Sequence, residues 1–217
     1  MTTALIFGGT FDPVHLGHLL SARSLLELFD DARLIMVPCQ IPPHRMLPKA
    51  AGTHRLNMLK IAVEDEKSIL VDECEVNREG KSYTYDTLTM FRKRWPDARL
   101  YFVLGSDSWA TLTEWYRWRE LTNYAHLAVL ARPGQSVIES LILKDWAEPK
   151  TLELNQVSAK AGNVVKLRLK QVEISATLIR ESLSKRQSVE NWLPDKVANY
   201  IEKNRLYNCL DDCARKK

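Results

Sequence analysis

The chain has 217 residues, of which 45% are hydrophobic and 27% are charged, and its formal net charge at pH 7 is +4. These values are ordinary for one globular domain, and no apolar run reaches the roughly 18 residues of a membrane span, so we expect no membrane association. Basic residues form no block except at the terminal residues 214–217, so we expect no nucleic-acid partner, although the mild positive charge suits a protein that binds polyphosphates.

The first predicted elements are a strand over Ala4–Phe7 and an amphipathic helix over Leu16–Phe29, joined by a glycine turn. Gly8 and Gly9 follow the strand, and because they carry no Cβ, a bulky anion can approach their backbone amides. The helix start adds unpaired N–H groups and a partial positive charge for that anion. A strand–glycine–helix turn alone is a weak signal, because many such turns only connect two elements.

Two histidines strengthen the signal at this turn. His15 and His18 are three residues apart at the helix start, so both rings can face one bound group, and Gly17 between them lets a ligand sit close. A histidine in this position can also merely cap the helix, but two of them beside a Gly-Gly turn favour a phosphate site. Imidazoles there can donate to phosphate oxygens without abstracting a proton.

Strand-like and helix-like patterns alternate through the first two-thirds of the chain. Further strands are expected at Arg33–Val37, Ile69–Val71 with Cys74–Val76, Leu100–Leu104 and Leu127–Ala131, and further helices at Thr53–Glu66, Thr84–Arg94 and roughly Thr113–Leu121. Near-continuous apolar strands separated by helices indicate a mostly parallel sheet covered on both faces, which is a doubly wound α/β fold. Ligands of such folds bind beyond the carboxyl ends of the strands.

The last third begins with a segment over Gln135–Gly162 that we interpret as a variable insertion. We expect a helical piece at Val137–Trp146, a strand over Val164–Ile174, and helices over Leu178–Leu183 and Pro194–Lys203. The predicted organisation is one domain over residues 1–217, with a core at 1–175, a small C-terminal helical part at 176–208 and a polar tail at 209–217.

The four cysteines suit reduced thiols, and the N-terminus shows no signal-peptide pattern, so we expect a cytoplasmic protein. Cys209 and Cys213 lie four residues apart near the polar tail. A zinc site there would need two more ligands, and none of the histidines lies close in sequence. We therefore expect no metal site built by the protein.

Polar residues follow several predicted strands. Ser175, Thr177 and Arg180 surround the start of the helix after the last strand, where they form either a cap with a solvent-facing arginine or a polyphosphate clamp. The residues alone leave these two interpretations even. Asp107 follows Gly105 at the end of the central strand, where it can cap the next helix or accept hydrogen bonds from ribose hydroxyls.

Aromatic residues crowd the stretch from Trp109 to Trp118, and core packing is the default for such a cluster and the expectation for these two tryptophans. Arg45 and Arg132 lie in loops at strand ends, where they can meet phosphates. His126 starts a strand and is expected to be structural.

Residues 8–18, Gly-Gly-Thr-Phe-Asp-Pro-Val-His-Leu-Gly-His, resemble the signature of the adenylyl- and cytidylyltransferase superfamily, whose His-x-Gly-His motif is matched at 15–18. Over almost its whole length the chain is similar to the bacterial nicotinate-nucleotide adenylyltransferases. The further matches, in order, are Pro42–Arg45, Thr53–Arg55, Ser82–Thr84, Gly105–Ser108, Trp115–Tyr116, Arg132–Gly134 and Ile174–Arg180. Arg45 stands where many relatives carry lysine, and Ser106 fills a variable position.

The resemblance implies a Rossmann-like nucleotidyltransferase fold and the transfer of AMP from ATP to nicotinate mononucleotide, giving deamido-NAD and pyrophosphate in NAD biosynthesis. Mg²⁺ would be carried on the ATP rather than in a protein cage. A phosphate nucleophile is already ionised at neutral pH, so catalysis would consist mostly of positioning and electrostatic stabilisation. The expected partners are the two nucleotides, with no nucleic acid and no membrane, and the expected state is a monomer or small homo-oligomer.

The resemblance also assigns residues to roles. The catalytic residues would be His15, His18 and Arg180; ATP would be bound by Gly8, Gly9, Thr10, Phe11, Gly17, Gly105, Asp107, Ser175 and Thr177; the mononucleotide would be bound by Arg45, Thr84, Trp115, Tyr116 and Arg132. An indole would stack on the pyridine ring, and the backbone N–H groups of Thr84 and Tyr116 would hold its carboxylate.

Two alternatives stay open. One is a sister adenylyltransferase that uses nicotinamide mononucleotide or phosphopantetheine as its acceptor. The other is a non-catalytic nucleotide-sensing module on the same fold.

Overall fold

The computed structural model describes residues 2–29, 31–43, 46–131, 139–169 and 174–207, and within them six strands form one sheet. In sheet order the strands are β3 (Ile69–Val71), β2 (Arg33–Pro38), β1 (Thr3–Gly9), β4 (Arg99–Gly105), β5 (His126–Ala131) and β6 (Val164–Arg168). All neighbouring strands are parallel. The strand order reverses between β1 and β4, which is where doubly wound folds bind their ligands.

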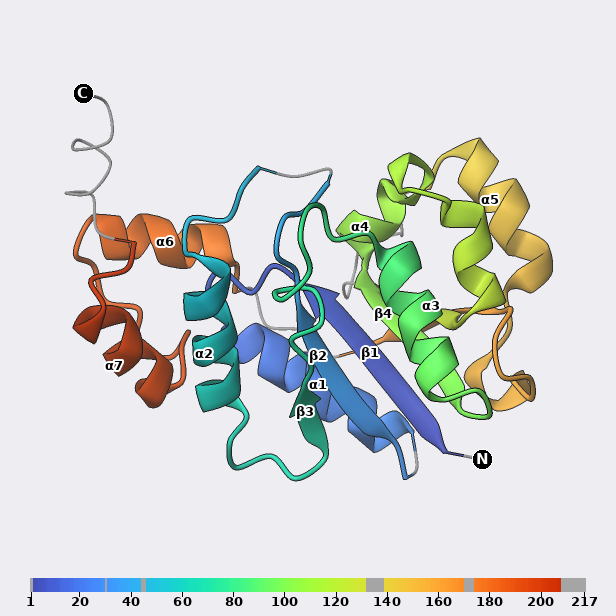
Figure 1. Ribbon diagram of the computed structural model, residues 1–217, viewed down its shortest axis with the longest axis horizontal. Coiled ribbons are helices and arrows are strands. Elements are labelled where there is room, and N and C mark those ends of the chain that lie inside the picture. The colour runs from blue at the N-terminus through green and yellow to red at the C-terminus, as the bar shows by residue number, and fades with distance from the viewer. Residues whose placement is uncertain (1, 30, 44–45, 132–138, 170–173, 208–217) are drawn as a thin grey trace.

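Helices cover both faces of this sheet (Figure 1). The α-helices are α1 (Leu16–Leu28), α2 (Gly52–Ala62), α3 (Thr84–Arg94), α4 (Ser106–Ala110), α5 (Leu141–Ala147), α6 (Ala176–Ser184) and α7 (Asp195–Lys203), and the 3-10 helices are η1 (Leu112–Glu114), η2 (Trp118–Asn123), η3 (Glu148–Lys150) and η4 (Leu154–Gln156). Successive residues of a strand point to opposite faces. Leu5 and Phe7 accordingly pack with side chains of α1, α2, α6 and α7, whereas Ala4 and Ile6 pack with side chains of α3, α4 and α5.

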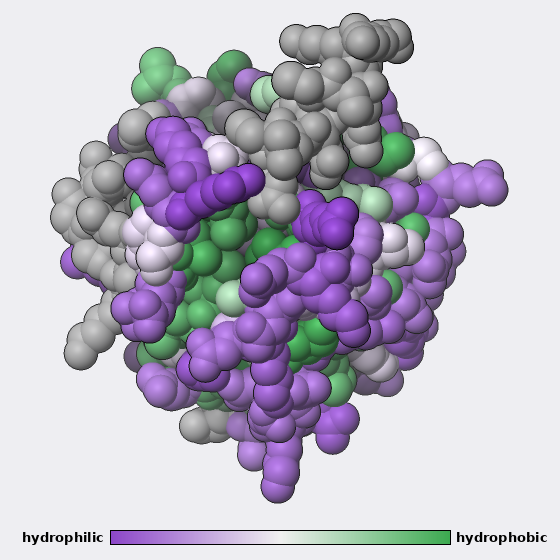
Figure 2. All heavy atoms as spheres, turned by 90° about the vertical axis from the view of Figure 1, so that its left-hand side faces the viewer, coloured by the Kyte–Doolittle hydropathy of each residue, from purple (hydrophilic) through white to green (hydrophobic). Residues whose placement is uncertain are grey.

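The C-terminal helices α6 and α7 lie beside α2 (Figure 1) and belong to the first of these two cores. Ile179, Val197 and Ile201 are buried in it. Figure 2 views this side of the molecule, where hydrophilic residues surround a central group of hydrophobic ones. Among the described residues, no helix combines the length and the apolar character needed to cross a membrane.

The prediction of a doubly wound, mostly parallel sheet is confirmed, and the predicted helix Thr84–Arg94 coincides with α3. The predicted helix at Thr113–Leu121 is wrong. The chain forms η1 and η2 instead, and between them Arg117 has a left-handed φ of 53° that a right-handed helix cannot contain. This break turns Trp115 and Tyr116 toward the end of β4 rather than along a helix face.

Smaller differences have local causes. Cys74–Val76 is a turn rather than a strand, because the Asp72 carboxylate accepts a hydrogen bond from the Cys74 N–H at 2.9 Å. The helix expected to reach Glu66 ends at Ala62, and Pro194 is the N-cap of α7 rather than part of its first turn. The strand expected over Val164–Ile174 ends at Arg168, and residues 137–138 and 170–173 of the predicted elements lie outside the described residues.

Candidate active site

A cavity of about 230 Å³ lies at the carboxyl ends of β1 and β4. It brings together segments that are far apart in sequence: the glycine turn after β1, the start of α3, the start of α4 and the chain around η1. The predicted site residues that line it are Gly8, Gly9, Thr10, Thr84, Gly105, Asp107, Trp115 and Tyr116. The position agrees with the rule that ligands bind beyond the carboxyl ends of parallel strands.

The glycines of the first motif make room for side chains of the protein itself. A Cβ on Gly9 would lie 2.8 Å from the ring of Phe11, and a Cβ on Gly17 would lie 3.0 Å from Nδ1 of His15. Gly8 would meet the ring of Phe102 at 3.1 Å. The three glycines therefore allow aromatic rings to pack closely against the backbone. This is a second reason for glycine at these positions, beside the expected approach of an anion.

His15 and His18 form a stacked pair at the start of α1. Their ring centroids are 3.7 Å apart with an interplanar angle of 26°, and the ring of Phe11 packs edge-to-face on His18 with 5.0 Å between the ring centroids. Nδ1 of His18 accepts the backbone N–H of His15 at 3.3 Å, so the neutral ring carries its proton on Nε2, where it can donate to a ligand. The capping alternative and the binding alternative thus use different nitrogens of one ring.

Both histidines are neutral near pH 7. Burial lowers the pKa of His15 to about 4, and burial together with the neighbouring His15 ring lowers the pKa of His18 well below its usual value. Within the described residues, Nδ1 of His15 is buried and has no hydrogen-bond partner. A buried polar atom without a partner costs free energy, so a ligand that satisfied it would be stabilised.

The start of α6 reaches the same turn from the C-terminal part of the chain. The Ser175 hydroxyl accepts the Leu178 N–H at 3.1 Å, and is therefore the expected helix cap. Arg180 is not directed to solvent, because it donates to the carbonyl of Asp12 at 2.6 Å and to the hydroxyl of Thr177 at 3.2 Å. A guanidinium and a helix start thus flank the loop between β1 and α1.

The predicted residues consequently fall into two groups that adjoin at Gly9 and Thr10. One group lines the cavity. The other group surrounds the start of α1 and does not line the cavity. Its members are Phe11, His15, Gly17, His18, Ser175, Thr177 and Arg180. Arg45 and Arg132 lie outside the described residues, so their contacts with phosphates stay predictions.

The aromatic wall of the cavity is partly core and partly exposed. Trp109 and Trp118 are buried, as expected. Trp115 is half-buried, lines the cavity and meets the ring of Phe102 edge-on at 6.3 Å, so it serves core and cavity together. Tyr116 is 49% exposed and its ring lies 4.9 Å from that of Tyr83.

Thr84 is the first residue of α3, and its N–H is one of the helix-start donors that have no partner within the helix. The preceding residue Tyr83 provides no side-chain cap. The helix start therefore presents donors to the cavity that Thr84 lines, and a carboxylate is the kind of group that such donors favour.

Sequence reasoning missed two buried charged residues next to the cavity. Arg55 is 1% exposed, and its guanidinium donates to four backbone carbonyls, which belong to Thr10, Cys39, Gln40 and Ala50. It therefore ties the turn after β1 to the turn after β2. The sequence showed Arg55 only as part of the Thr53–Arg55 motif, because burial of a charge depends on tertiary contacts.

Glu75 is the second missed residue, and it lines the cavity while only 7% exposed. Its carboxylate accepts the hydroxyl of Thr87 at 2.6 Å, and burial raises its pKa, partly offset by its hydrogen bonds to Thr87 and Ser82. The Thr87 hydroxyl also accepts from Arg78 at 3.2 Å. Glu75 thus links the cavity to the first turns of α3. The sequence around Glu75 gives no sign of this link, because it depends on a tertiary contact.

His126 is structural, as expected. Its Nδ1 accepts the Asn163 N–H at 3.1 Å, so Nε2 carries the proton and donates to the carbonyl of Ala159 at 3.0 Å. Among the described residues, no group of three or more histidine, cysteine, aspartate or glutamate side chains is placed to hold a metal ion.

Comparisons with known proteins agree with this architecture. The cytidylyltransferase-like family model matches residues 6–182. A protein of Hahella chejuensis named "Probable nicotinate-nucleotide adenylyltransferase" is 42% identical over 211 residues, which cover 95% of this chain and 96% of the relative. An Escherichia coli protein of the same name is 38% identical over 210 residues, covering 93% and 97% of the two chains.

The fold is similar to that of a solved structure with much lower sequence identity. The nicotinic acid mononucleotide adenylyltransferase of Plasmodium falciparum, complexed with NaAD, superposes with a TM-score of 0.72 at 20% identity and covers 95% of this chain. With a stacked histidine pair at the first helix and a cavity beyond the carboxyl ends of β1 and β4, the chain belongs to the cytidylyltransferase-like family and, within it, to the nicotinate-nucleotide adenylyltransferases.

Proposed function

We propose that the protein transfers the adenylyl group of Mg–ATP to nicotinate mononucleotide and releases deamido-NAD and pyrophosphate. The observation that carries this proposal is the meeting of two groups at Gly9 and Thr10: a neutral histidine pair with an arginine on one side, and an aromatic-walled cavity on the other. The names of the relatives that match 95% and 93% of the chain support the acceptor.

For this reaction the protein has to position the two substrates and stabilise the charge that develops on the phosphates. A phosphate oxygen of the mononucleotide attacks the α-phosphorus of ATP, while the bond from that phosphorus to the bridging oxygen of the β-phosphate breaks and pyrophosphate leaves with the electron pair. The attacking phosphate is already ionised, so no general base is required. Mg²⁺ enters as part of the ATP substrate, and the remaining barrier is lowered by aligned hydrogen-bond donors.

The phosphate half of the site would use the histidine pair and α6. His18 donates from Nε2 to an oxygen of the reacting phosphates, and because its ring is neutral it remains a donor without giving up its proton to them. The unpartnered Nδ1 of His15 would gain a partner from the bound nucleotide or its water. Arg180 lies within reach of the same turn, and its planar fork suits the β- and γ-phosphates.

The acceptor half would use the cavity. Trp115 offers an indole to the pyridine ring, and the N–H groups of Thr84 and Tyr116 would hold the carboxylate. A carboxamide would turn its NH₂ group toward these donors, so an uncharged pyridine mononucleotide should be disfavoured. Asp107 lines the same cavity and would accept hydrogen bonds from the adenosine ribose.

Initial rates of pyrophosphate release test the proposal. The enzyme is assayed with Mg–ATP and, separately, with nicotinate mononucleotide, nicotinamide mononucleotide or phosphopantetheine. We expect the highest kcat/KM with the acid mononucleotide. A preference for another acceptor would identify a sister enzyme, whereas calorimetric binding of ATP without turnover on any acceptor would identify a nucleotide-sensing module.

Further expectations from the sequence remain proposals in the same sense. They are a cytoplasmic location, a monomer or small homo-oligomer, and phosphate contacts of Arg45 and Arg132. Light scattering during gel filtration measures the assembly state, and alanine variants at the two arginines, assayed against each nucleotide, show which phosphates they meet.

A further inference from the structure

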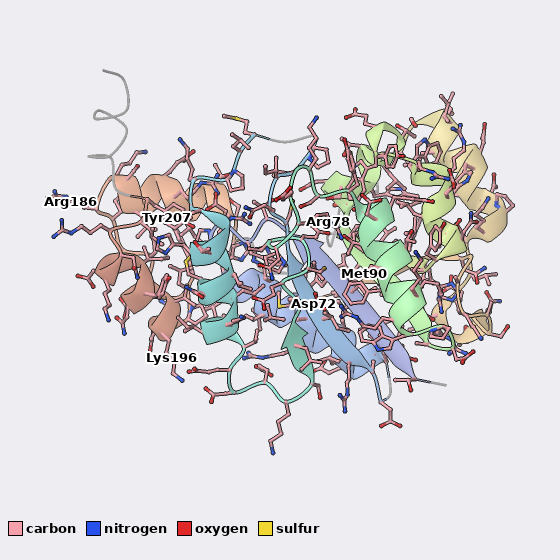
Figure 3. All side chains as sticks on the ribbon, viewed as in Figure 1. Asp72, Arg78, Met90, Arg186, Lys196 and Tyr207 are labelled. Atoms are coloured by element: carbon pink, nitrogen blue, oxygen red, sulfur yellow. The ribbon has the colours of Figure 1, made fainter. Side chains whose placement is uncertain are left out.

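The C-terminal part of the chain contacts the phosphate turn through one tyrosine. The hydroxyl of Tyr207 donates to Oδ1 of Asp12 at 2.8 Å, although the two residues are 195 positions apart in sequence. Figure 3 labels Tyr207 among the C-terminal helices, on the side that faces α2. Asp12 belongs to the loop between β1 and α1, so this contact joins the chain's last described residue to the motif at residues 8–18.

The side chain of Asp12 accepts three hydrogen bonds. The residue is 5% exposed, and its carboxylate accepts the N–H of Lys49 at 2.7 Å, the N–H of Ala50 at 3.0 Å and the hydroxyl of Tyr207. Nη1 of Arg180 lies 3.9 Å from Oδ2 of this carboxylate and donates instead to the backbone carbonyl of Asp12 at 2.6 Å. One residue therefore holds the tyrosine by its side chain and the arginine by its backbone.

We propose that Tyr207 is a positioning residue for Arg180, acting through Asp12. Together with the N–H groups of Lys49 and Ala50, the tyrosine hydroxyl satisfies the carboxylate with neutral donors. The arginine therefore stays on the carbonyl, from which its remaining N–H groups can meet a triphosphate. This inference rests on the proposed role of Arg180 toward ATP.

Without the Tyr207 hydroxyl, the buried carboxylate would lose one of its three donors, and Oδ1 would keep only the N–H of Ala50. Loss of a hydrogen bond to a buried charge is costly, and a charged donor close by is the strongest replacement. Arg180 is such a donor, so it would move from the carbonyl onto the carboxylate and be drawn away from the nucleotide. Burial and the charge of Asp12 both raise the pKa of Tyr207, so the hydroxyl remains a donor throughout the working pH range.

The test compares two tyrosines of the C-terminal part. Y207F removes only the hydroxyl that contacts Asp12. Y200F is the matched control, because Tyr200 lies on α7 and its hydroxyl contacts His54 at 3.0 Å and Asn57 at 3.1 Å, both on α2. We expect Y207F to weaken Mg–ATP binding about tenfold, by KM and by calorimetry, with the mononucleotide KM changed less than about twofold. Y200F should change neither value.

A double-mutant cycle shows whether the effect passes through Arg180. Calorimetric Kd values for Mg–ATP are measured for Y207F, R180A and the double variant, and we expect the Y207F effect to vanish in the R180A background. An undiminished effect there would overturn the inference, as would an equal loss for both substrates in Y207F. Partial unfolding would weaken the binding of both substrates by the same factor, so a lower Tm cannot imitate a loss that is selective for Mg–ATP.

The same cycle separates this inference from the function on which it rests. If R180A leaves the Kd for Mg–ATP unchanged, the proposed role of Arg180 fails and the inference falls with it. If R180A weakens ATP binding but Y207F does not, only the positioning role of Tyr207 is overturned.

Discussion

At the scale of single residues, the two ring nitrogens of His18 have different roles. Nδ1 of His18 accepts a backbone N–H at the helix start, and Nε2 is left to donate to a ligand. Because the rings are 3.7 Å apart, two positive charges there would repel each other, and burial already keeps both rings neutral. The pair is therefore suited to hydrogen bonding rather than to proton exchange.

Substitution of His18 separates these two tasks. H18A should lower kcat by roughly 10²- to 10³-fold, because loss of one donor aimed at developing charge costs about 3 kcal/mol. H18N should be equally slow, since its short amide can accept the His15 N–H but cannot reach as Nε2 does. Single-turnover rates and urea unfolding are the measurements. More than a tenth of the normal kcat in H18A, or recovery of rate in H18N, would contradict the catalytic role.

Trp115 provides a second test at this scale, with Trp118 as its control. W115A should raise the mononucleotide KM by at least about fivefold, equivalent to roughly 1 kcal/mol, with little change in the ATP KM. W118A removes a buried indole that does not line the cavity, so it should cost about 3–5 kcal/mol of stability without this selectivity.

Because Trp115 also packs on Phe102, some loss of stability is expected in W115A as well. The substrate ratio is therefore the decisive readout, and Tm is the control. Equal increases in both KM values would leave Trp115 as a core residue only.

At the scale of elements, the start of α3 depends on a buried hydrogen-bond network. Thr87 lies one turn into the helix, is 1% exposed, and its hydroxyl joins Glu75 to Arg78. Glu75 lines the cavity, so the network links the orientation of the helix to the shape of the acceptor pocket.

T87V should disturb that network, and T87S should preserve it. Valine keeps the shape of threonine but removes one of the hydrogen bonds to the buried Glu75 carboxylate, which costs about 1–3 kcal/mol. We expect T87V to lower stability by this amount and to raise the mononucleotide KM, while T87S keeps the KM near normal. Urea unfolding and steady-state kinetics check this, and a T87S enzyme as impaired as T87V would show that the hydroxyl is not responsible.

Elements with regular periodicity could be predicted from the sequence, and irregular ones could not. The apolar run of β1 and the pattern of α3 appear within a short window, so their positions were clear. The chain from Thr113 to Leu121 has a helical spacing of apolar residues, but its path depends on the left-handed Arg117 and on packing against β4. Local propensity does not contain that information.

The candidate site divides in the same way. The histidines and glycines of residues 8–18 could be predicted as site residues, because they form one contiguous motif whose chemistry is visible in the residue order. The roles of Arg55, Glu75 and Tyr207 were not predicted, because each acts through burial or through a partner far away in sequence. Their roles arise only when the fold brings distant segments together.

At the scale of the whole molecule, buried neutral histidines make stability depend on pH. The pKa of His15 falls to about 4 on folding, while an unfolded histidine titrates near 6.5. Between these values the unfolded chain binds more protons than the folded one, so stability falls as the pH is lowered from about 6.5 to about 4. The lowered pKa values of His18 and His126 act in the same direction.

Urea unfolding between pH 7.5 and 4 tests whether the free energy of unfolding decreases as the pH is lowered. The contribution of His15 alone amounts to roughly 3 kcal/mol at the acid end, from about 1.4 kcal/mol per pKa unit. H15N removes a titrating group, so its stability should decline less steeply over that window than that of the wild type. Parallel pH curves for the two proteins would contradict the assignment of a depressed pKa to His15.

The division of the site at Gly9 and Thr10 has a consequence for how such enzymes diversify. The reacting phosphates would be bound by α1 and α6, whereas the acceptor would be recognised by the start of α3 and by the chain around η1. Mutations in the second set can retarget the enzyme to another acceptor while the adenylyl chemistry is inherited unchanged. One ancestral scaffold could thereby give rise to a series of transferases that differ in the molecule they adenylylate.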